Sequence, residues 1–457
     1  MADKGKILVN VYKGKSYVPL KDINVILNPS ENKNDVISLK TNVIGQTEVV
    51  DVGAPPIELS QKPEYTERPY SLWDITVRGE GFKEVVIKNA QVLPDVTAVQ
   101  DINLMETGNM RETEVKEEII DVQPNRLYGK FPPKIPEAPE KTLPKSPGGG
   151  FVVLDQVSVP EYVIVHAGTP TNTGAPNYTV PFKDYIKNVA SSEIYATWPE
   201  STIRANIYCI LSFTLNRVFT EWYEGKGYRF TITNSTAFDH AFSYGRNIFD
   251  NISRIVDEIF TSYIKRRGAK QPLLTQYCDG ERVKCPGWLT QWGSKYLGDQ
   301  GKTPYEILTH FYGSDIDLEK APKVSGIPKS YPGYTLEIGS NGEPVRNIQT
   351  YLNRISQNYP LIPKVAVDGV YGPTTAESVK VFQQIFNLPQ TGKVDYATWY
   401  QISNIYVGVS KIAELRGSIG LNDNELENVS RELGIFVPPT FITGRGLDMP
   451  TIDFPIE

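Results

Sequence analysis

A chain of 457 residues is longer than one ordinary domain, and about three domains are expected. Hydrophobic residues make up 40% and charged residues 22% of the chain, which is typical of a soluble globular protein. The formal net charge of −6 argues against a general nucleic-acid binder, and the absence of an apolar run of about 18 residues argues against a membrane span.

The first 125 residues predict a small β-sandwich. Short β-branched runs such as Ile7–Tyr12, Ile23–Leu27 and Trp73–Val77 are separated by Gly, Pro and Asn turns. The first of these runs is too short for a secretory apolar region, so we expect synthesis without ordinary export. The pattern resembles transthyretin-like and carboxypeptidase-regulatory-like domains. It contains no catalytic constellation, which favours a chaperoning, anchoring or inhibitory role.

Residues 126–150 are predicted to be a linker. They are rich in Pro and then in Gly, and such a segment is extended and exposed rather than packed into a core. Exposed and extended backbone is also a good target for a protease.

Residues 151–325 form the largest block, and its pattern mixes helix with strand. Apolar residues at helical spacing predict helices at Tyr185–Ser192, Ser201–Tyr223, Ile248–Ile264 and Pro304–Tyr312. Residues 326–410 are expected to be a compact helical module. Residues 411–457 are expected to be a tail with one helix near Asp423–Gly434. The predicted fold class is therefore multidomain α+β.

The segment Tyr185–Cys209 places one carboxyl group, that of Glu193, beside an apolar turn rich in Tyr and Trp. A carboxyl group in such surroundings can hold a proton at neutral pH and act as an acid. Together with Cys285–Tyr312, this segment resembles the SpoIID/LytB family, whose members cut the glycan strands of peptidoglycan. The chain departs from that family at Leu211, where Arg is common, and at Cys285–Gly287, where Gly-His-Gly is common.

The resemblance implies a lytic transglycosylase in which Glu193 is both acid and base, because such an enzyme needs only one carboxyl group. Gln291 would bind sugar, hold Glu193 or have a structural role. Asp239 and His240 form a possible pair in the cleft. We also expect Trp198 and Trp292 to contact the glycan.

The sequence indicates no cofactor and no metal site. We expect Cys278 and Cys285 to be reduced and buried, and a disulfide between them is the second alternative. A zinc site is the third alternative, because it would also need His240 or His310 as a ligand.

The C-terminal module resembles the peptidoglycan-binding type 1 domain, a three-helix bundle. The resemblance rests on Gly339–Leu352, on Val367–Ala376 with its Asp-Gly turn, and on Thr391–Trp399. We expect Asp368 and Tyr371 to contact peptidoglycan.

The whole arrangement resembles the spore cortex-lytic enzymes of clostridia. That resemblance implies a zymogen located in the spore, in the cortex or coat region, and activated by a subtilisin-like germination protease. The implied cut falls at Gln156–Val157, with Gln91–Val92 as an alternative. Two rivals remain: an amidase, which would normally need a metal, and a non-catalytic wall-binding or phage-tail protein.

Overall fold

The computed structural model of the chain describes residues 3–321 apart from 15–17, 33–34, 44, 109–116, 138–156 and 161, and residues 332–406 apart from 333, 387, 396–397, 400 and 404. The chain forms two compact units. One contains residues 1–15 and 19–324, and the other contains residues 325–457 together with 16–18. The protein is a multidomain α+β protein, as the sequence predicts. The helix predicted near Asp423–Gly434 lies outside the described residues.

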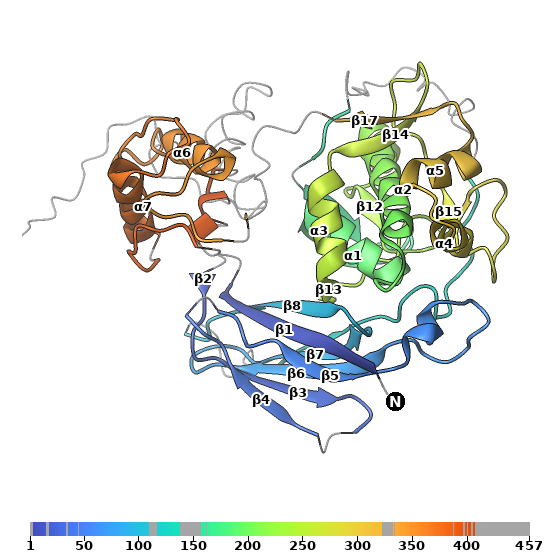
Figure 1. Cartoon of the computed structure of the whole chain (residues 1–457), viewed down its shortest axis with the longest axis horizontal. Helices are drawn as coiled ribbons and strands as arrows, with labels where there is room; N and C mark the ends of the chain where they lie inside the picture. The colour runs from blue at the N-terminus through green and yellow to red at the C-terminus, as the bar shows by residue number, and fades with distance from the viewer. Residues whose placement is uncertain are drawn as a thin grey trace, which may run out of the picture. The chain divides into compact units, whose positions relative to one another are not determined.

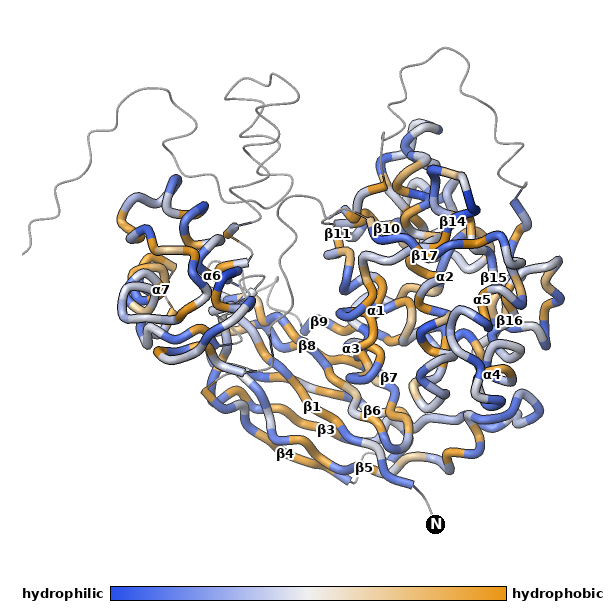
Figure 2. Tube along the Cα trace, turned by 45° about the horizontal axis from the view of Figure 1, so that its top comes forward, coloured by the Kyte–Doolittle hydropathy of each residue, from blue (hydrophilic) through white to orange (hydrophobic). Residues whose placement is uncertain are grey.

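Two five-stranded sheets form the N-terminal part of the first unit (Figure 1). Their strands are β1 (Asp3–Lys13), β2 (Val18–Pro19), β3 (Asn24–Pro29), β4 (Ile37–Lys40), β5 (Val50–Ala54), β6 (Ser71–Arg78), β7 (Val85–Val92), β8 (Thr97–Leu104), β9 (Glu118–Asp121) and β13 (Ile248–Phe249). One sheet has the order β13-β8-β1-β2, with β5 also paired to β1, and the other has the order β4-β3-β6-β7-β9. Alternate residues of β3 and β6 are buried, as expected for strands with one face on a core. Figure 2 shows hydrophobic residues following β1 and β3.

The strand β13 joins the N-terminal sheets to the middle block. It pairs antiparallel with β8, with Ile248 opposite Val99 and Phe249 opposite Ala98. Next to it, the side-chain amide of Asn247 exchanges two hydrogen bonds of 2.9 Å with the backbone of Gln91. One sheet therefore contains strands from both parts of the chain, and the two parts form one compact unit.

The middle block is built around α2 (Glu200–Phe219), most of whose residues are buried. A helix that is buried on nearly all sides must have neighbours all round. Figure 1 shows α2 among the other helices of the block, and it contacts each of them. These helices are α1 (Phe182–Glu193), α3 (Asp250–Ile259), α4 (Gln291–Asp299) and α5 (Pro304–Tyr312), and the short strands of the block are β10 (Tyr162–His166), β11 (Asn177–Pro181), β12 (Ile232–Thr233), β14 (Ser262–Arg266), β15 (Tyr277–Cys278), β16 (Leu289–Thr290) and β17 (Ile316–Lys320).

The single helix predicted over Ile248–Ile264 is wrong at both ends. Only α3 (Asp250–Ile259) is helical, and the ends of the predicted range belong to β13 and β14. The isoleucines in this range satisfy helical spacing, but they are also strong strand formers. Pairing of β13 with β8 and of β14 with β17 decides in favour of strand.

The second unit contains α6 (Glu343–Ile355), α7 (Pro373–Ile385) and further helical residues at 398–399, 401–403 and 405–406. This agrees with the predicted helical module. Its core includes Leu352, Phe382 and Trp399, as predicted from the sequence. Within the described residues of the whole chain, no helix combines the length and apolar character that a membrane crossing would need.

Two buried glutamines hold the turns of the second unit. The side-chain oxygen of Gln349 accepts the N–H of Gly369 at 2.8 Å, and that of Gln383 accepts the N–H of Gly392 at 2.9 Å. Both glycines have positive φ, at 77° and 65°, which favours Gly. Each glutamine therefore ties a helix to a turn.

We predict that Gln349→Ala and Gln383→Ala each lower the free energy of unfolding of the second unit by about 1–3 kcal/mol, because buried turn amides lose their acceptor. Calorimetry of the full chain measures this as a lower transition temperature for that unit. Gln357→Ala, at an exposed position of the same unit, is the control. Equal effects of the three substitutions would contradict the role given to the two buried glutamines.

Candidate functional site

Glu193 is the last residue of α1 and is fully buried, with 0% of its surface exposed. One carboxylate oxygen accepts the backbone N–H of Ala241 at 2.7 Å. The other pairs with the guanidinium of Arg126 at 3.3 Å. The C-terminal end of a helix carries partial negative charge, so an ionised carboxylate there depends on such partners.

Tyr277 lies beside this carboxylate and begins a row of three buried rings, Tyr277, His240 and Phe213, which we call the aromatic floor. The ring centroids of Phe213 and His240 are 4.6 Å apart, and those of His240 and Tyr277 are 5.9 Å apart. Aromatic faces of this kind, next to an acid, are suited to the apolar face of a sugar ring.

Two cations lie over the aromatic floor. The guanidinium carbon of Arg126 is 5.6 Å from the ring centroid of Tyr277. The ammonium nitrogen of Lys134 is 4.3 Å from that of Phe213 and 5.1 Å from that of Tyr277. This ammonium is buried and has no hydrogen-bond partner within the described residues.

The titration of these groups follows from their burial. Burial lowers the pKa of Lys134 to about 7, with a further lowering by Arg126 that Glu193 partly opposes. Burial also holds the pKa of His240 well below its usual range, and the neighbouring cations, Lys134 first, act in the same direction. His240 is therefore neutral at physiological pH.

Both cations come from one stretch of chain, residues 122–137, which we call the covering segment. Its backbone donates from Arg126 to the carbonyl of Ser192 at 2.8 Å and from Ile135 to the carbonyl of Ala237 at 2.7 Å. Within the predicted linker, residues 126–137 contact the middle block, with Arg126, Leu127 and Lys134 buried and most of the others exposed. Proline-rich chain has no core of its own, but here it packs against the rings and carbonyls of another part of the protein. Residues 138–150 lie outside the described residues.

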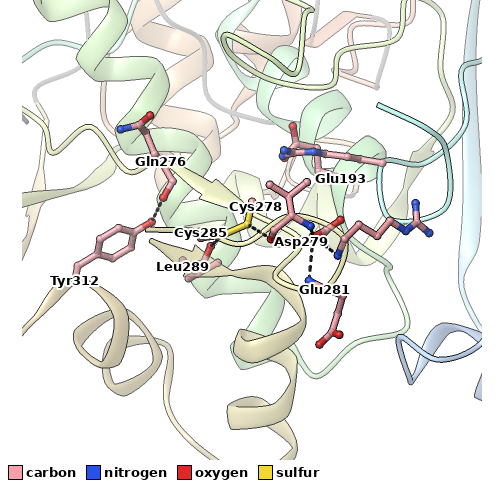
Figure 3. The surroundings of a disulfide bond; sticks show 11 residues. Glu193, Gln276, Cys278, Asp279, Glu281, Cys285, Leu289 and Tyr312 are labelled. Carbon is pink, nitrogen blue, oxygen red and sulfur yellow. Dashed lines mark hydrogen bonds and ion pairs between the residues drawn. A yellow bond between two sulfur atoms is a disulfide. The ribbon is translucent and has the colours of Figure 1, made fainter. Parts of the chain in front are cut away.

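The loop between Cys278 and Cys285 is closed by a disulfide and also contacts the covering segment. Cys278 and Cys285 are joined, in place of the reduced thiols that the sequence favoured. Figure 3 shows this disulfide beside Asp279, with Glu193 in the same view. From the closed loop, Arg282 donates to three successive backbone carbonyls of the covering segment at 2.6, 3.2 and 2.9 Å, those of Leu127, Tyr128 and Gly129.

Gln291 holds Glu193 in place. It is the first residue of α4 and is fully buried, and its side-chain N–H donates to the backbone carbonyl of Glu193 at 3.0 Å. Of the roles considered for Gln291, the structure shows this contact with Glu193. Its side-chain oxygen has no hydrogen-bond partner among the described residues.

Asp239 and His240 are both fully buried, but they do not form a pair. The carboxylate of Asp239 pairs with Arg217 at 2.8 Å. The ring of His240 shares a hydrogen bond of 2.9 Å with the hydroxyl of Tyr185. In place of the predicted pair, Asp239 and His240 thus take part in two separate arrangements with different partners.

Trp198 and Trp292 lie together, with ring centroids 5.0 Å apart, and Tyr195 joins them. The indole N–H of Trp198 donates at 2.8 Å to the carbonyl of Ser60, in the short helix Ile57–Ser60 of the N-terminal part. The two tryptophans thus pack together, and Trp198 is buried.

Asp368 and Tyr371 shape a turn of the second unit. Asp368 accepts the N–H of Val370 at 2.8 Å and a side-chain N–H of Gln349 at 2.9 Å. These hydrogen bonds, the backbone one first, hold the pKa of Asp368 below its usual value. Tyr371 is fully buried and donates to the carbonyl of Gly392 at 2.9 Å, so its side chain does not reach the surface where a ligand would lie.

The two candidate cleavage bonds differ in their surroundings. Gln91–Val92 lies at the end of β7, with Gln91 1% and Val92 0% exposed, so this alternative bond is closed to a protease. Gln156 lies outside the described residues, and Val157 is buried.

Sequence reasoning missed Arg126, Lys134 and Arg217. Each is a cation that is at most 8% exposed. The sequence gives little sign of their role, because Arg126 and Lys134 lie in a segment that its composition predicts to be a solvated linker. A buried carboxylate needs a cation, but the sequence does not say which of 47 Lys and Arg residues supplies it.

Comparison with known proteins identifies one part of the chain. Residues 341–402 match the family model described as a putative peptidoglycan binding domain, and this supports peptidoglycan as a partner. No curated protein matches the chain. Within the described residues, no group of three or more His, Cys, Asp and Glu residues is arranged to hold a metal ion.

The chain has weak likeness to several solved structures. The Bacillus anthracis TIE protein is 16% identical over 23% of this chain and 17% of its own, with a TM-score of 0.17. A 3-chlorocatechol 1,2-dioxygenase from Rhodococcus opacus is 11% identical over 23% of this chain and 61% of its own, with a TM-score of 0.17. A cohesin–X-dockerin complex from Acetivibrio cellulolyticus is 11% identical over 21% of this chain and 52% of its own, with a TM-score of 0.14. The chain thus spans less than two thirds of the length of each of them. Similarities this weak indicate neither a fold nor a function for this chain.

We predict that the free energy of unfolding of the first unit rises between about pH 7 and about pH 9 through Lys134, whose pKa in the folded chain is about 7. An unfolded lysine titrates near pH 10.4, so across this range the unfolded chain binds a proton that the folded chain does not. Urea denaturation across this range should show a positive slope that Lys134→Met reduces.

Lys130→Met, at an exposed position of the same segment, is the control and should keep the wild-type slope. The range stops below pH 10 because buried tyrosines, whose pKa values are raised, act in the opposite direction above it. An unchanged slope in Lys134→Met would contradict the buried, uncharged state given to Lys134 at high pH.

Proposed function

We propose that the chain is the zymogen of a lytic transglycosylase that cleaves the glycan strands of spore cortex peptidoglycan during germination. The peptidoglycan-binding match at residues 341–402 associates the protein with the cell wall. The observation that favours catalysis in the other unit is a fully buried carboxyl group, that of Glu193, beside an aromatic floor. In its whole arrangement the chain resembles the clostridial spore cortex-lytic enzyme SleC.

The proposed reaction uses the carboxyl group of Glu193 twice. Its proton passes to the glycosidic oxygen as the bond from that oxygen to C1 of muramic acid breaks. The resulting carboxylate then takes the proton of the 6-hydroxyl, whose oxygen closes onto C1 to give a 1,6-anhydro product. The glycan is thus cleaved without water, and Glu193 ends with its proton restored.

Two residues would position the acid for this reaction. Gln291 holds the backbone of Glu193, and the N–H of Ala241 holds one carboxyl oxygen. When Arg126 is removed, a buried carboxyl group remains at the negative end of α1 without its cation. The first step of the proposed reaction needs the protonated form of this carboxyl group.

The zymogen part of the proposal rests on the covering segment. Arg126 occupies the carboxylate of Glu193, and Lys134 occupies the aromatic floor, so a sugar cannot enter while the segment is docked. A cut within 138–156 by a subtilisin-like protease, as at Gln156–Val157, would free the end of this segment. The hydrogen bonds of Arg282 and the pairing of β13 with β8 still hold the first piece after such a cut. Activation therefore needs both the cut and the release of the N-terminal piece.

Two rivals make different demands on these residues. An amidase would release stem peptides and leave the glycan intact. A wall-binding or phage-tail structural protein would keep the module at 341–402 and tolerate the loss of Glu193. Neither explains why a carboxyl group beside three rings is covered by two cations from another segment.

We predict that cortex peptidoglycan treated with the cut and released protein yields 1,6-anhydro muropeptides, and that Glu193→Gln lowers their yield at least about a hundredfold. Mass spectrometry of the digest measures this. Glu200→Gln, which changes an exposed carboxylate seven positions later in the chain, should keep the yield. Free stem peptides would favour the amidase, and no products at all would favour the structural protein.

We predict that Arg126→Ala loosens the covering segment in the uncut chain. Removal of one partner of a buried ion pair costs about 3–5 kcal/mol, since the other charge stays buried. Limited proteolysis should then cut residues 126–137 at least about tenfold faster than in the wild type.

Arg78→Ala is the control, because Arg78 pairs with Glu84 at an exposed site and such pairs contribute about 0–1 kcal/mol. If Arg126→Ala and Arg78→Ala were cut at the same rate, the contact between Arg126 and Glu193 would not be what holds the segment.

A further inference from the structure

Arg217 makes a second charged contact with the covering segment, away from Glu193. It lies in the last turn of α2, and its side chain is 0% exposed. Its two terminal nitrogens both donate to the carboxylate of Glu137, one at 2.9 Å to Oε2 and the other to Oε1. This two-pronged arrangement is the geometry in which Arg recognises carboxylates most strongly.

The charge of Arg217 is already balanced within the middle block. Its Nε donates to Asp239 at 2.8 Å. The other oxygen of Asp239 accepts the hydroxyl of Tyr223 and both the backbone N–H and the hydroxyl of Thr233, at 2.7 to 2.9 Å. Glu137 is therefore a second carboxylate on Arg217, and the buried pair with Asp239 does not need it.

The guanidinium is held in a fixed position by rings of the same block. Its carbon lies 4.6 Å from the ring centroid of Phe213, 4.9 Å from that of Trp222 and 5.7 Å from that of Tyr223. When the covering segment leaves, these contacts and the contact with Asp239 all remain. Only the carboxylate of Glu137 is lost. The two terminal nitrogens of Arg217, which we call its fork, then remain in position to donate to another carboxylate.

This fork and Glu193 are linked through rings that they share with the covering segment. Phe213 lies under both Arg217 and Lys134, and Tyr277 lies under both Lys134 and Arg126. In chain order, Arg126, Lys134 and Glu137 of the covering segment thus contact Glu193, the aromatic floor and Arg217.

The covering segment also fills backbone acceptors near Glu193. Asn125 donates from its side chain to the carbonyls of Ser191 and Ile194, at 3.3 and 3.1 Å, and the backbone N–H of Arg126 donates to Ser192. These carbonyls lie at the C-terminal end of α1 and its cap, and that of Ser191 also accepts a guanidinium N–H of Arg246. A ligand that replaces the segment needs hydroxyl or amide donors at these carbonyls and a carboxylate at Arg217.

We propose that Arg217 is the carboxylate-binding subsite of the mature cleft, and that Glu137 occupies it in the uncut chain in place of a carboxylate of the substrate. The ligand is a glycan with a carboxylate-bearing substituent, placed on the side of the aromatic floor away from Glu193. This proposal rests on the proposed function, because it takes the cleft as a glycan site. In peptidoglycan, the carboxylate is either that of a free lactyl group or one on the stem peptide.

The test uses the full chain cut within 138–156, with both pieces kept together and a dye on the N-terminal piece. Three ligands are titrated against it: N-acetylmuramic acid, with a lactyl carboxylate; muramyl dipeptide, with a peptide carboxylate; and N-acetylglucosamine, with none. Fluorescence anisotropy follows release of the N-terminal piece. At least one carboxylate ligand should release it at about tenfold lower concentration than N-acetylglucosamine does. The better of the two identifies the source of the carboxylate.

Two variants separate this subsite from a simple docking ion pair. Arg217→Lys keeps a cation beside Asp239 but loses the fork, so it should abolish the preference for carboxylate ligands. Glu137→Gln should ease release by every ligand while the preference persists. Circular dichroism checks that both variants are folded, and the comparison of the three ligands on the wild type stands without them.

The outcomes distinguish the subsite from the glycan cleft. Equal potency of the three ligands would overturn the carboxylate subsite and leave the glycan cleft in place. Failure of all three to release the piece, and to bind the cut protein by calorimetry, would overturn both. A preference that survives Arg217→Lys would assign the carboxylate to another residue and overturn the role of Arg217.

Discussion

A carboxyl group buried at the C-terminal end of a helix needs a compensating charge, and in this protein Arg126 supplies it to Glu193. The cation does not come from the middle block that surrounds the carboxyl group. It comes from the covering segment, residues 122–137, which is tied to the N-terminal sheets. The charge balance of the candidate site therefore depends on a part of the chain outside the block that contains the carboxyl group. Under the proposed function, removing that part would take the cation and the cover away from Glu193 together.

The contacts of the covering segment follow the same logic along its length. It places a cation on the acid, a second cation on the aromatic floor and a carboxylate on Arg217. Each of these groups meets a partner of opposite charge or a ring. The same features that hold the segment in place would hold a glycan with hydroxyl, amide and carboxylate groups. Specific inhibition and specific substrate binding would thus draw on one set of residues.

The sequence predicted the helical C-terminal module and the helices around Glu193, because those segments carry strong local signals such as the Asp-Gly turn at Asp368 and helical spacing of apolar residues. It could not predict that residues 126–137 are docked, because nothing local distinguishes a packed proline-rich segment from a free one. It misjudged Ile248–Ile264, where pairing with distant strands overrides helical spacing. It grouped Asp239 with His240, but two adjacent side chains can serve different partners, and only the fold shows that Arg217 takes one and Tyr185 the other.

The most direct measurement follows one protease-treated sample over time, by hydrogen exchange at the end of α1 and the amide of Ala241 and by the release of anhydro products from cortex peptidoglycan. If the covering segment controls Glu193, exchange at these amides should accelerate as the N-terminal piece is released, and products should appear at the same rate. Products formed at full rate while the amides stay protected would contradict it, and so would exchange that accelerates without any products.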